Sequence, residues 1–162
     1  FSIMKIRIIL KKMSYENSKH RRILKSCLIT WFSNPKELHL TNPNMTYPFQ
    51  FNQWMNLSYK GQNTETWVAF SGEWIVGMIS LKKISEEKRG HLFHLYVNKQ
   101  NRKQGFEQKL IRKIEEKMKE HNLNILTLNV VPKNSEALAL YEKMGFTKID
   151  SNKKKFTMSK NV

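Results

Sequence analysis

The chain is poor in several features that mark common classes of protein. Its 162 residues include a single cysteine, Cys27, which excludes an internal disulfide and favours a reducing compartment, so we expect a cytoplasmic protein. No stretch approaches the roughly eighteen consecutive apolar residues of a membrane-spanning helix. The apolar run in residues 1–10 lacks the small-residue cleavage site of a signal peptide. We therefore expect one domain over residues 1–162, without a membrane segment.

Patterns for metal chemistry and for common nucleophiles are also missing. The five histidines have no ligand spacing, the cysteine stands alone, and acidic residues are few, with Asp150 the only aspartate. Neither a G-x-S-x-G string nor a P-loop string is present. The sequence therefore predicts no metal site.

Positive charge, by contrast, is abundant. The formal net charge is +16, and 23 lysines accompany only 6 arginines. Two explanations remain open: a lysine-rich composition without a function of its own, or an anionic partner. A nucleic-acid module favours arginine and interleaved aromatic residues along one stripe, whereas the lysines here are scattered. Nucleic acid is therefore not the expected partner.

The first third of the chain predicts one strand and two helices. β-branched residues predict a strand over residues 3–10. An apolar stripe predicts a helix from about Ser18 to Asn34-Pro35, where a turn signal ends it. Residues 37–50 are expected to form a loop, and residues 49–59 a second helix.

Two pairs of strands are predicted further along. Residues 67–70 and 74–81 are expected to form a hairpin around Ser71-Gly72-Glu73. Residues 146–149 and 156–159 are expected to close the fold as a second pair.

The stretch between these pairs organises the chain. Residues 92–97 predict a central strand, followed by a basic loop that ends at Gly105 and a helix near 105–121. A strand over 125–131 and a helix over 134–143 come next. A strand, a polar loop with glycine and a helix form the arrangement that aims backbone N–H groups at a phosphate.

Two motifs in this stretch resemble those of the GNAT acetyltransferase superfamily. Residues 102–107, Arg-Lys-Gln-Gly-Phe-Glu, are similar to (Q/R)-x-x-G-x-(G/A), with a departure at Glu107. Residues 134–146 match N-x-x-A-x-x-L-Y-x-x-x-G-F. The resemblance implies an α/β (α+β) fold with a mixed, mostly antiparallel central sheet and helices on both faces. The implied order is β-α-α-β-β-β-α-β-α-β-β.

The resemblance also implies acetyl-CoA as co-substrate. Backbone N–H groups of residues 102–107 would meet its pyrophosphate at the helix start, where the helix dipole helps. A carboxylate at Glu107 is expected to weaken this binding. The residues implied in cofactor binding are Leu95, Tyr96, Val97, Arg102, Lys103, Gln104, Gly105, Phe106, Glu107, Asn129, Asn134 and Tyr141. Asn134 is also expected to be a helix N-cap.

Tyr141 and a proton acceptor are the candidate catalytic groups. The resemblance places the Tyr141 hydroxyl beside the thioester sulfur as a general acid; the alternative is a core tyrosine. No Asp or Glu lies in residues 90–106 or 121–135. A base must therefore be a carboxylate from elsewhere, such as Glu65 or Glu73, a histidine, or a water relay.

His91 and His94 are the histidine candidates. His91 lies eleven residues before Arg102, the position of the base in the histone-acetylating branch of the superfamily. Strand alternation predicts His91 on the face shared by Leu95 and Val97, and His94 on the other face. The alternative for each is a structural histidine whose ring nitrogens hydrogen-bond to neighbouring residues and take no part in catalysis.

The favoured function is direct transfer of an acetyl group from acetyl-CoA to a primary amine. Backbone N–H groups near Tyr96 and Val97 would polarise the thioester carbonyl. The alternative is a non-catalytic module on the same fold that binds acyl-CoA or docks on RNA or the ribosome. Expected acceptors are small-molecule amines or a peptide N-terminus, neutral or anionic rather than polycationic. The sequence leaves the oligomeric state open between a monomer and a homodimer.

Overall fold

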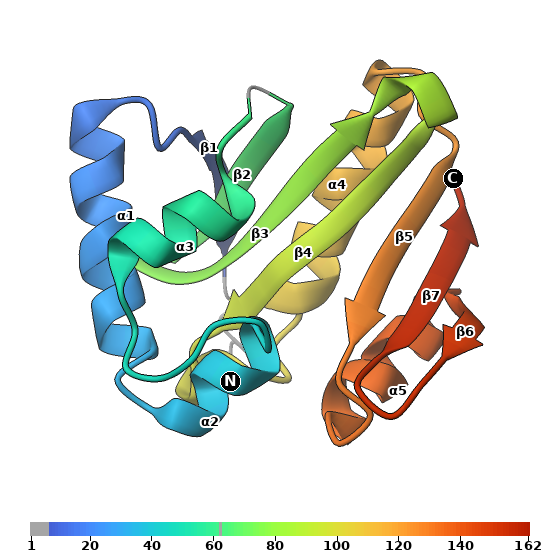
Figure 1. Ribbon diagram of the computed structural model, residues 1–162. Helices are drawn as coiled ribbons and strands as arrows, with labels where there is room; N and C mark the ends of the chain where they lie inside the picture. Colours follow the sequence, from blue (N-terminus) through green and yellow to red (C-terminus); the bar gives the residue numbers. More distant parts are fainter. Residues whose placement is uncertain (1–6, 62) are drawn as a thin grey trace, which may run out of the picture.

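A seven-stranded sheet forms the centre of the molecule (Figure 1). The computed structural model describes residues 7–61 and 63–162. In spatial order the strands are β1 (Ile8–Met13), β2 (Thr64–Ser71), β3 (Trp74–Ile84), β4 (Arg89–Val97), β5 (Ile125–Val130), β7 (Phe156–Asn161) and β6 (Thr147–Ser151). Neighbouring strands are antiparallel except β4 and β5, which are parallel. The predicted mixed, mostly antiparallel sheet is confirmed.

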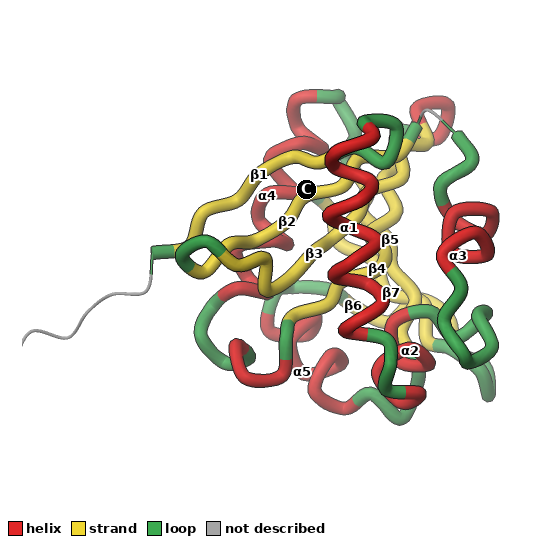
Figure 2. The backbone as a smooth tube through the Cα atoms, turned by 90° about the vertical axis from the view of Figure 1, so that its left-hand side faces the viewer, coloured by secondary structure: helices red, strands yellow, loops and turns green. Residues whose placement is uncertain are grey.

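Helices cover both faces of this sheet, as predicted. They are α1 (Ser18–Trp31), α2 (Pro35–Thr41), α3 (Phe51–Ser58), α4 (Phe106–Glu120) and α5 (Ser135–Lys143). Figure 2 shows the sheet between α4 on one side and α3 on the other. Short 3-10 turns occur at Ser85–Glu87 and Lys99–Asn101.

The two faces bury separate hydrophobic cores. The first core joins α4 and α5 to the sheet through residues such as Leu110, Ile114 and Tyr141. The second joins α1 and α3 to the sheet and is rich in aromatic residues. Cys27 packs against this second core and is half-buried.

Helix α2 corrects the predicted order. The loop prediction for residues 37–50 is wrong at its beginning, because Asn34-Pro35 starts a helix instead of only ending one. The Asn34 side-chain oxygen accepts hydrogen bonds from the backbone N–H groups of Lys36 at 2.9 Å and Glu37 at 3.3 Å. Proline suits the first turn that follows, where its missing N–H costs nothing. Three helices, not two, therefore separate β1 from β2.

The first strand is also displaced from its prediction. Part of the predicted range, residues 3–6, lies outside the described residues, and β1 extends to Met13. Its lysines are tolerated because β1 is an edge strand whose one neighbour is β2. The other elements occur close to their predicted positions. They are the β2–β3 hairpin, the helix predicted over residues 49–59, which is α3, the central strand–loop–helix and the closing strand pair.

Among residues 7–61 and 63–162, no helix combines the length and the apolar character that crossing a membrane would require.

Candidate functional site

Strands β4 and β5 pair over only three positions and then diverge (Figure 1). The paired positions are Arg89 with Ile125, Gly90 with Leu126, and His91 with Thr127. Beyond them, β4 continues to Val97 and β5 to Val130, but the two strands no longer pair with each other. The second half of β4 therefore turns a backbone edge toward a gap in the sheet, and such edges are ready to bind an extended ligand.

A β-bulge interrupts β4 at the same place. Met78 pairs with Tyr96 and Ser80 with Phe93, so His94 and Leu95 together oppose Ile79. His94 has a positive φ of 53°. Bulges re-aim a strand and are common beside functional sites.

The bulge changes which side chains share a face of the sheet. Leu95 and Val97 pack in the α4 core, and Phe93 and Tyr96 pack in the α1/α3 core. Leu126 and Leu128 face α4, so Thr127 between them and its register partner His91 face the opposite side. The prediction that His91 shares a face with Leu95 and Val97 is therefore wrong, because simple alternation fails across the bulge.

His91 lies at the last paired position before the gap opens. Its Nδ1 is 2.9 Å from the Thr127 hydroxyl oxygen. Burial, together with the positive charges of Arg89, Lys155 and Lys82, lowers the pKa of His91 to about 4. The imidazole is therefore neutral near pH 7 and can accept a proton, although weakly.

Neither alternative carboxylate is near the gap. Glu65 lies on β2, where it accepts a hydrogen bond from Trp67 Nε1 at 2.9 Å and pairs with Lys83. β3 separates β2 from β4. Glu73 lies in the turn between β2 and β3. Within the described part of the chain, the histidines are thus the nearer candidates.

The loop from β4 to α4 has the backbone shape of an anion-binding site. Lys103 and Gly105 have positive φ values of 62° and 93°. Gly105 caps α4 without a side-chain hydrogen bond, which leaves the first N–H groups of the helix available. A Cβ at Gly105 would approach only Ile8 Cδ1, at 3.9 Å. Glycine is thus favoured here by its φ angle and not by lack of space.

The side chains of this loop have different surroundings. Arg102 donates to the Val97 carbonyl and to Glu37 of α2, each at 2.8 Å. Lys103 and Gln104 are exposed, whereas Phe106 is completely buried in the α4 core. Arg102 thus pairs with Glu37, whereas Lys103 forms no ion pair within the described part of the chain.

Helix α5 brings the second motif to the same region. The Asn134 side chain accepts a hydrogen bond from Ala137 N at 3.2 Å, which confirms the predicted N-cap. Tyr141 is 6% exposed and packs edge-on against Phe146. Its hydroxyl makes no hydrogen bond to the described residues, and burial raises the pKa of this phenol. On β5, Asn129 accepts a hydrogen bond from Thr157 at 2.9 Å.

Glu107 and Glu136 show that the starts of α4 and α5 are close together. Glu107 is half-buried in the first turn of α4, and Glu136 lies in the first turn of α5. Burial raises the pKa of Glu107, and the charge of Glu136 raises it further, while Arg102 opposes both effects. The two helices thus begin beyond the carboxyl ends of β4 and β5, and each has a glutamate in its first turn.

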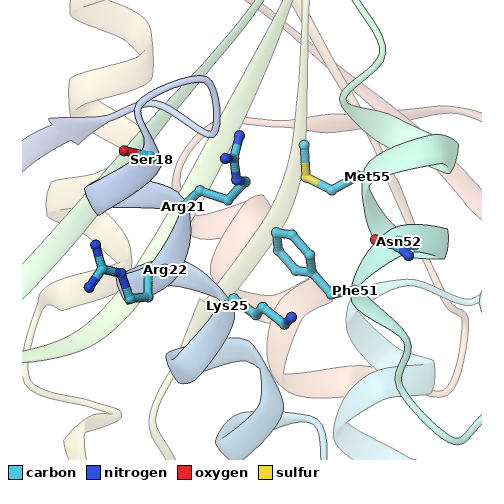
Figure 3. A pocket seen from close by; sticks show the side chains of 7 residues that line it. All are labelled: Ser18, Arg21, Arg22, Lys25, Phe51, Asn52 and Met55. Carbon is cyan, nitrogen blue, oxygen red and sulfur yellow. The ribbon is translucent and has the colours of Figure 1, made fainter.

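Two further clefts lie away from these residues. One, of about 490 Å³, separates α1 from α3 (Figure 3). There Arg21 and Lys25 of α1 extend toward Phe51 and Met55 of α3, and Arg22 also lines the cleft. The other, of about 530 Å³, lies between α1, the β2–β3 hairpin and the loop after β4. Neither is lined by a residue predicted for catalysis or cofactor binding.

Comparison with known proteins agrees with the geometry. Residues 27–146 match the acetyltransferase (GNAT) family. N-alpha-acetyltransferase 30 of Dictyostelium discoideum is 31% identical over 125 residues, 76% of this chain and 63% of that protein. Human N-acetyltransferase 8 is 35% identical over 86 residues, 51% of this chain and 38% of that protein. The chain thus spans less than two thirds of the length of these relatives.

Solved structures show the same fold. PaiA N-acetyltransferase from Thermoplasma acidophilum, in complex with coenzyme A, superposes with a TM-score of 0.71 at 21% identity. The alignment covers 96% of this chain and 99% of that one. With the family match over most of the chain and the diverging strands described above, this chain belongs to the GNAT acetyltransferase family.

Proposed function

We propose that this chain transfers an acetyl group from acetyl-CoA directly to a primary amine. The observation that carries the proposal is the position of two groups about the β4–β5 gap. His91 faces the α1/α3 side of the sheet, and Tyr141 packs in the core on the α4/α5 side. We infer that the two groups serve one opening from its two sides, His91 as proton acceptor for the amine and Tyr141 as proton donor to the thiolate.

The residues around the gap fit an acyl-CoA. The unpaired edge of β4 offers backbone groups to the amides of a pantetheine arm, beside Leu95, Asn129 and Asn134. The backbone N–H groups of residues 102–107 would hold the diphosphate at the start of α4. Among their side chains, Lys103 adds charge, and Glu107 opposes binding.

Acetyl-CoA, when bound, supplies an activated acyl group on a sulfur leaving group. The backbone N–H group of Val97 would stabilise negative charge on the carbonyl oxygen, because the Tyr96 N–H faces β3. As the amine nitrogen bonds to the carbonyl carbon and the carbon–sulfur bond breaks, His91 takes the proton from nitrogen, directly or through water. The Tyr141 hydroxyl donates a hydrogen bond or proton to the departing sulfur.

Charge supports neutral or anionic acceptors. Arg21, Arg22 and Lys25 line the cleft on the same side of the sheet as His91, and the chain carries a net charge of +16. A polycationic amine would approach against this field. The name of the Dictyostelium relative points to an alpha-amino group as acceptor in that protein, which supports including peptide N-termini among the acceptors.

A calorimetric titration with acetyl-CoA, followed by a free-thiol release assay, tests the proposal. The amine panel contains peptides with free N-termini, amino acids, an amino sugar nucleotide and a polyamine. Release above the hydrolysis background with at least one amine is expected. Binding without release on any amine would instead favour the non-catalytic acyl-CoA module.

A further inference from the structure

His94 has a backbone conformation that needs support. Its φ of 53° lies in the left-handed region, where a residue with a side chain is strained. It is also one of the two residues that oppose Ile79 in the β4 bulge. The bulge directly precedes Tyr96 and Val97. Asn98 N donates to the Val76 carbonyl of β3, so by alternation the Tyr96 N–H also faces β3 and the Val97 N–H faces the gap. The geometry of the bulge therefore decides where the Val97 N–H is aimed.

The His94 side chain is held on two sides. Its ring stacks on Trp54 of α3, with centroids 3.9 Å apart and planes 21° from parallel. Its Nδ1 lies 2.8 Å from the Tyr59 hydroxyl, just after the end of α3. Both histidine and tyrosine are buried, so neither contact is weakened by competing water.

The Tyr59 hydroxyl continues the network into the sheet. It lies 2.8 Å from the Ser80 hydroxyl of β3, which lies 2.9 Å from the Thr66 hydroxyl of β2. Ser80 is the register partner of Phe93, the residue before His94. A continuous line of buried hydroxyl groups thus joins β2, β3 and the end of α3 to the bulge.

We propose that Tyr59 and His94 are positioning residues for acetyl transfer. They hold the bulge so that the backbone N–H group of Val97, which points away from β3, meets the thioester carbonyl, and they connect α3 to this part of β4. This inference rests on the proposed function. It assigns neither residue a contact with the reacting atoms, and it adds a role for His94 other than that of a base.

The first test removes one hydroxyl group. Tyr59→Phe keeps the ring but deletes the contacts to His94 and Ser80. We expect kcat for thiol release to fall about tenfold, a fraction of the loss on removing an oxyanion donor outright, with the Kd for coenzyme A changed less than twofold. Tyr47→Phe, which removes the hydroxyl of an exposed tyrosine, is the control. An unchanged kcat in Tyr59→Phe would overturn the inference.

The second test separates positioning from stability. Glycine adopts a positive φ without strain, so His94→Gly should keep the bulge and most of kcat while its lost packing lowers the Tm. His94→Leu fills the space but cannot relieve the strain, so it should lose about tenfold in kcat with a smaller drop in Tm. If kcat instead follows Tm across the two variants, the role of His94 is only structural.

A third readout does not depend on activity. Hydrogen–deuterium exchange of the peptide spanning residues 93–98 should be slow in the parent chain and several-fold faster in Tyr59→Phe. Exchange in β7 should not change. If none of the amines in the panel supports thiol release by the parent chain, the proposed function fails. The exchange rates still decide whether the network holds the bulge. Equal rates in parent and variant would overturn the inference.

Discussion

Arg102 in the loop after β4 and Glu37 in α2 form an ion pair with 2.8 Å between Nη2 and Oε2. The same guanidinium donates from Nε to the Val97 carbonyl at 2.8 Å. One arginine thus joins the end of β4, the candidate phosphate loop and a helix that lies 65 residues earlier in the chain.

Arg102→Lys tests whether this guanidinium is structural or binds phosphate. A lysine ammonium keeps the charge but cannot span both partners, so stability should fall by about 1–2 kcal/mol. The Kd for coenzyme A should change less than threefold. Urea unfolding and calorimetry measure the two quantities. A tenfold weaker Kd at unchanged stability would mean that Arg102 leaves Glu37 to bind the cofactor.

Glu107→Gln should tighten coenzyme A binding by severalfold, because it removes a negative charge near the diphosphate. Burial raises the pKa of Glu107, so its protonation begins at a higher pH than for a free glutamate. Binding to the parent chain should therefore tighten as the pH falls toward that pKa, and the Gln variant should lack this gain. Glu120→Gln, at the other end of α4, is the control. Weaker binding in Glu107→Gln would show that the carboxylate supports the loop.

Tyr141→Phe should lower kcat for thiol release by at least about tenfold, because the phenol stabilises charge that develops on sulfur in the transition state. The ring keeps its packing against Phe146, and no hydrogen bond to a described residue is lost. The Tm should stay within a few degrees, and the Kd for acetyl-CoA within severalfold. An unchanged kcat would make Tyr141 part of the pocket wall only.

His91→Ala should lower kcat/KM by about a hundredfold at neutral pH, at the low end for a general base, because its lowered pKa makes it a weak one. The loss should shrink toward pH 9, where the free amine becomes abundant. His39→Ala, on the exposed side of α2, is the control. A constant ratio from pH 6 to 9 would remove His91 from the mechanism and favour a water relay.

Acid should destabilise the fold through the two strand histidines. Burial lowers the pKa values of His91 and His94 to about 4 and about 3, against about 6.5 in the unfolded chain. Below pH 6.5 the unfolded chain thus binds more protons, and stability falls until the folded-state pKa values are passed. The loss at pH 5 should be of order 2 kcal/mol per histidine. Urea unfolding at pH 7, 6 and 5 should show it, and His91→Gln should remove about half. A flat profile would contradict the burial of these rings.

Local sequence patterns predicted much of the fold and the location of the candidate site. The periods of apolar residues predicted α4 and the central strands, Gly105 marked the end of the loop before α4, and Asn134 marked a helix start. Each of these features depends on neighbours within one or two turns of the chain, so the sequence around it suffices. The motif order then indicated the family and the region where a cofactor would bind.

Tertiary contacts determined the features that the sequence did not predict. The parting of β4 from β5 after His91, the bulge that moves His94 toward Trp54 and the partner of Arg102 all depend on segments distant in sequence. The bulge reverses the face of each side chain beyond it, so counting alternate residues from His91 gave the wrong side. The sequence by itself determined the strands, the loop and the helices that flank the β4–β5 gap; packing between distant segments determined which way their side chains point, because each orientation is fixed by a partner that no local pattern names.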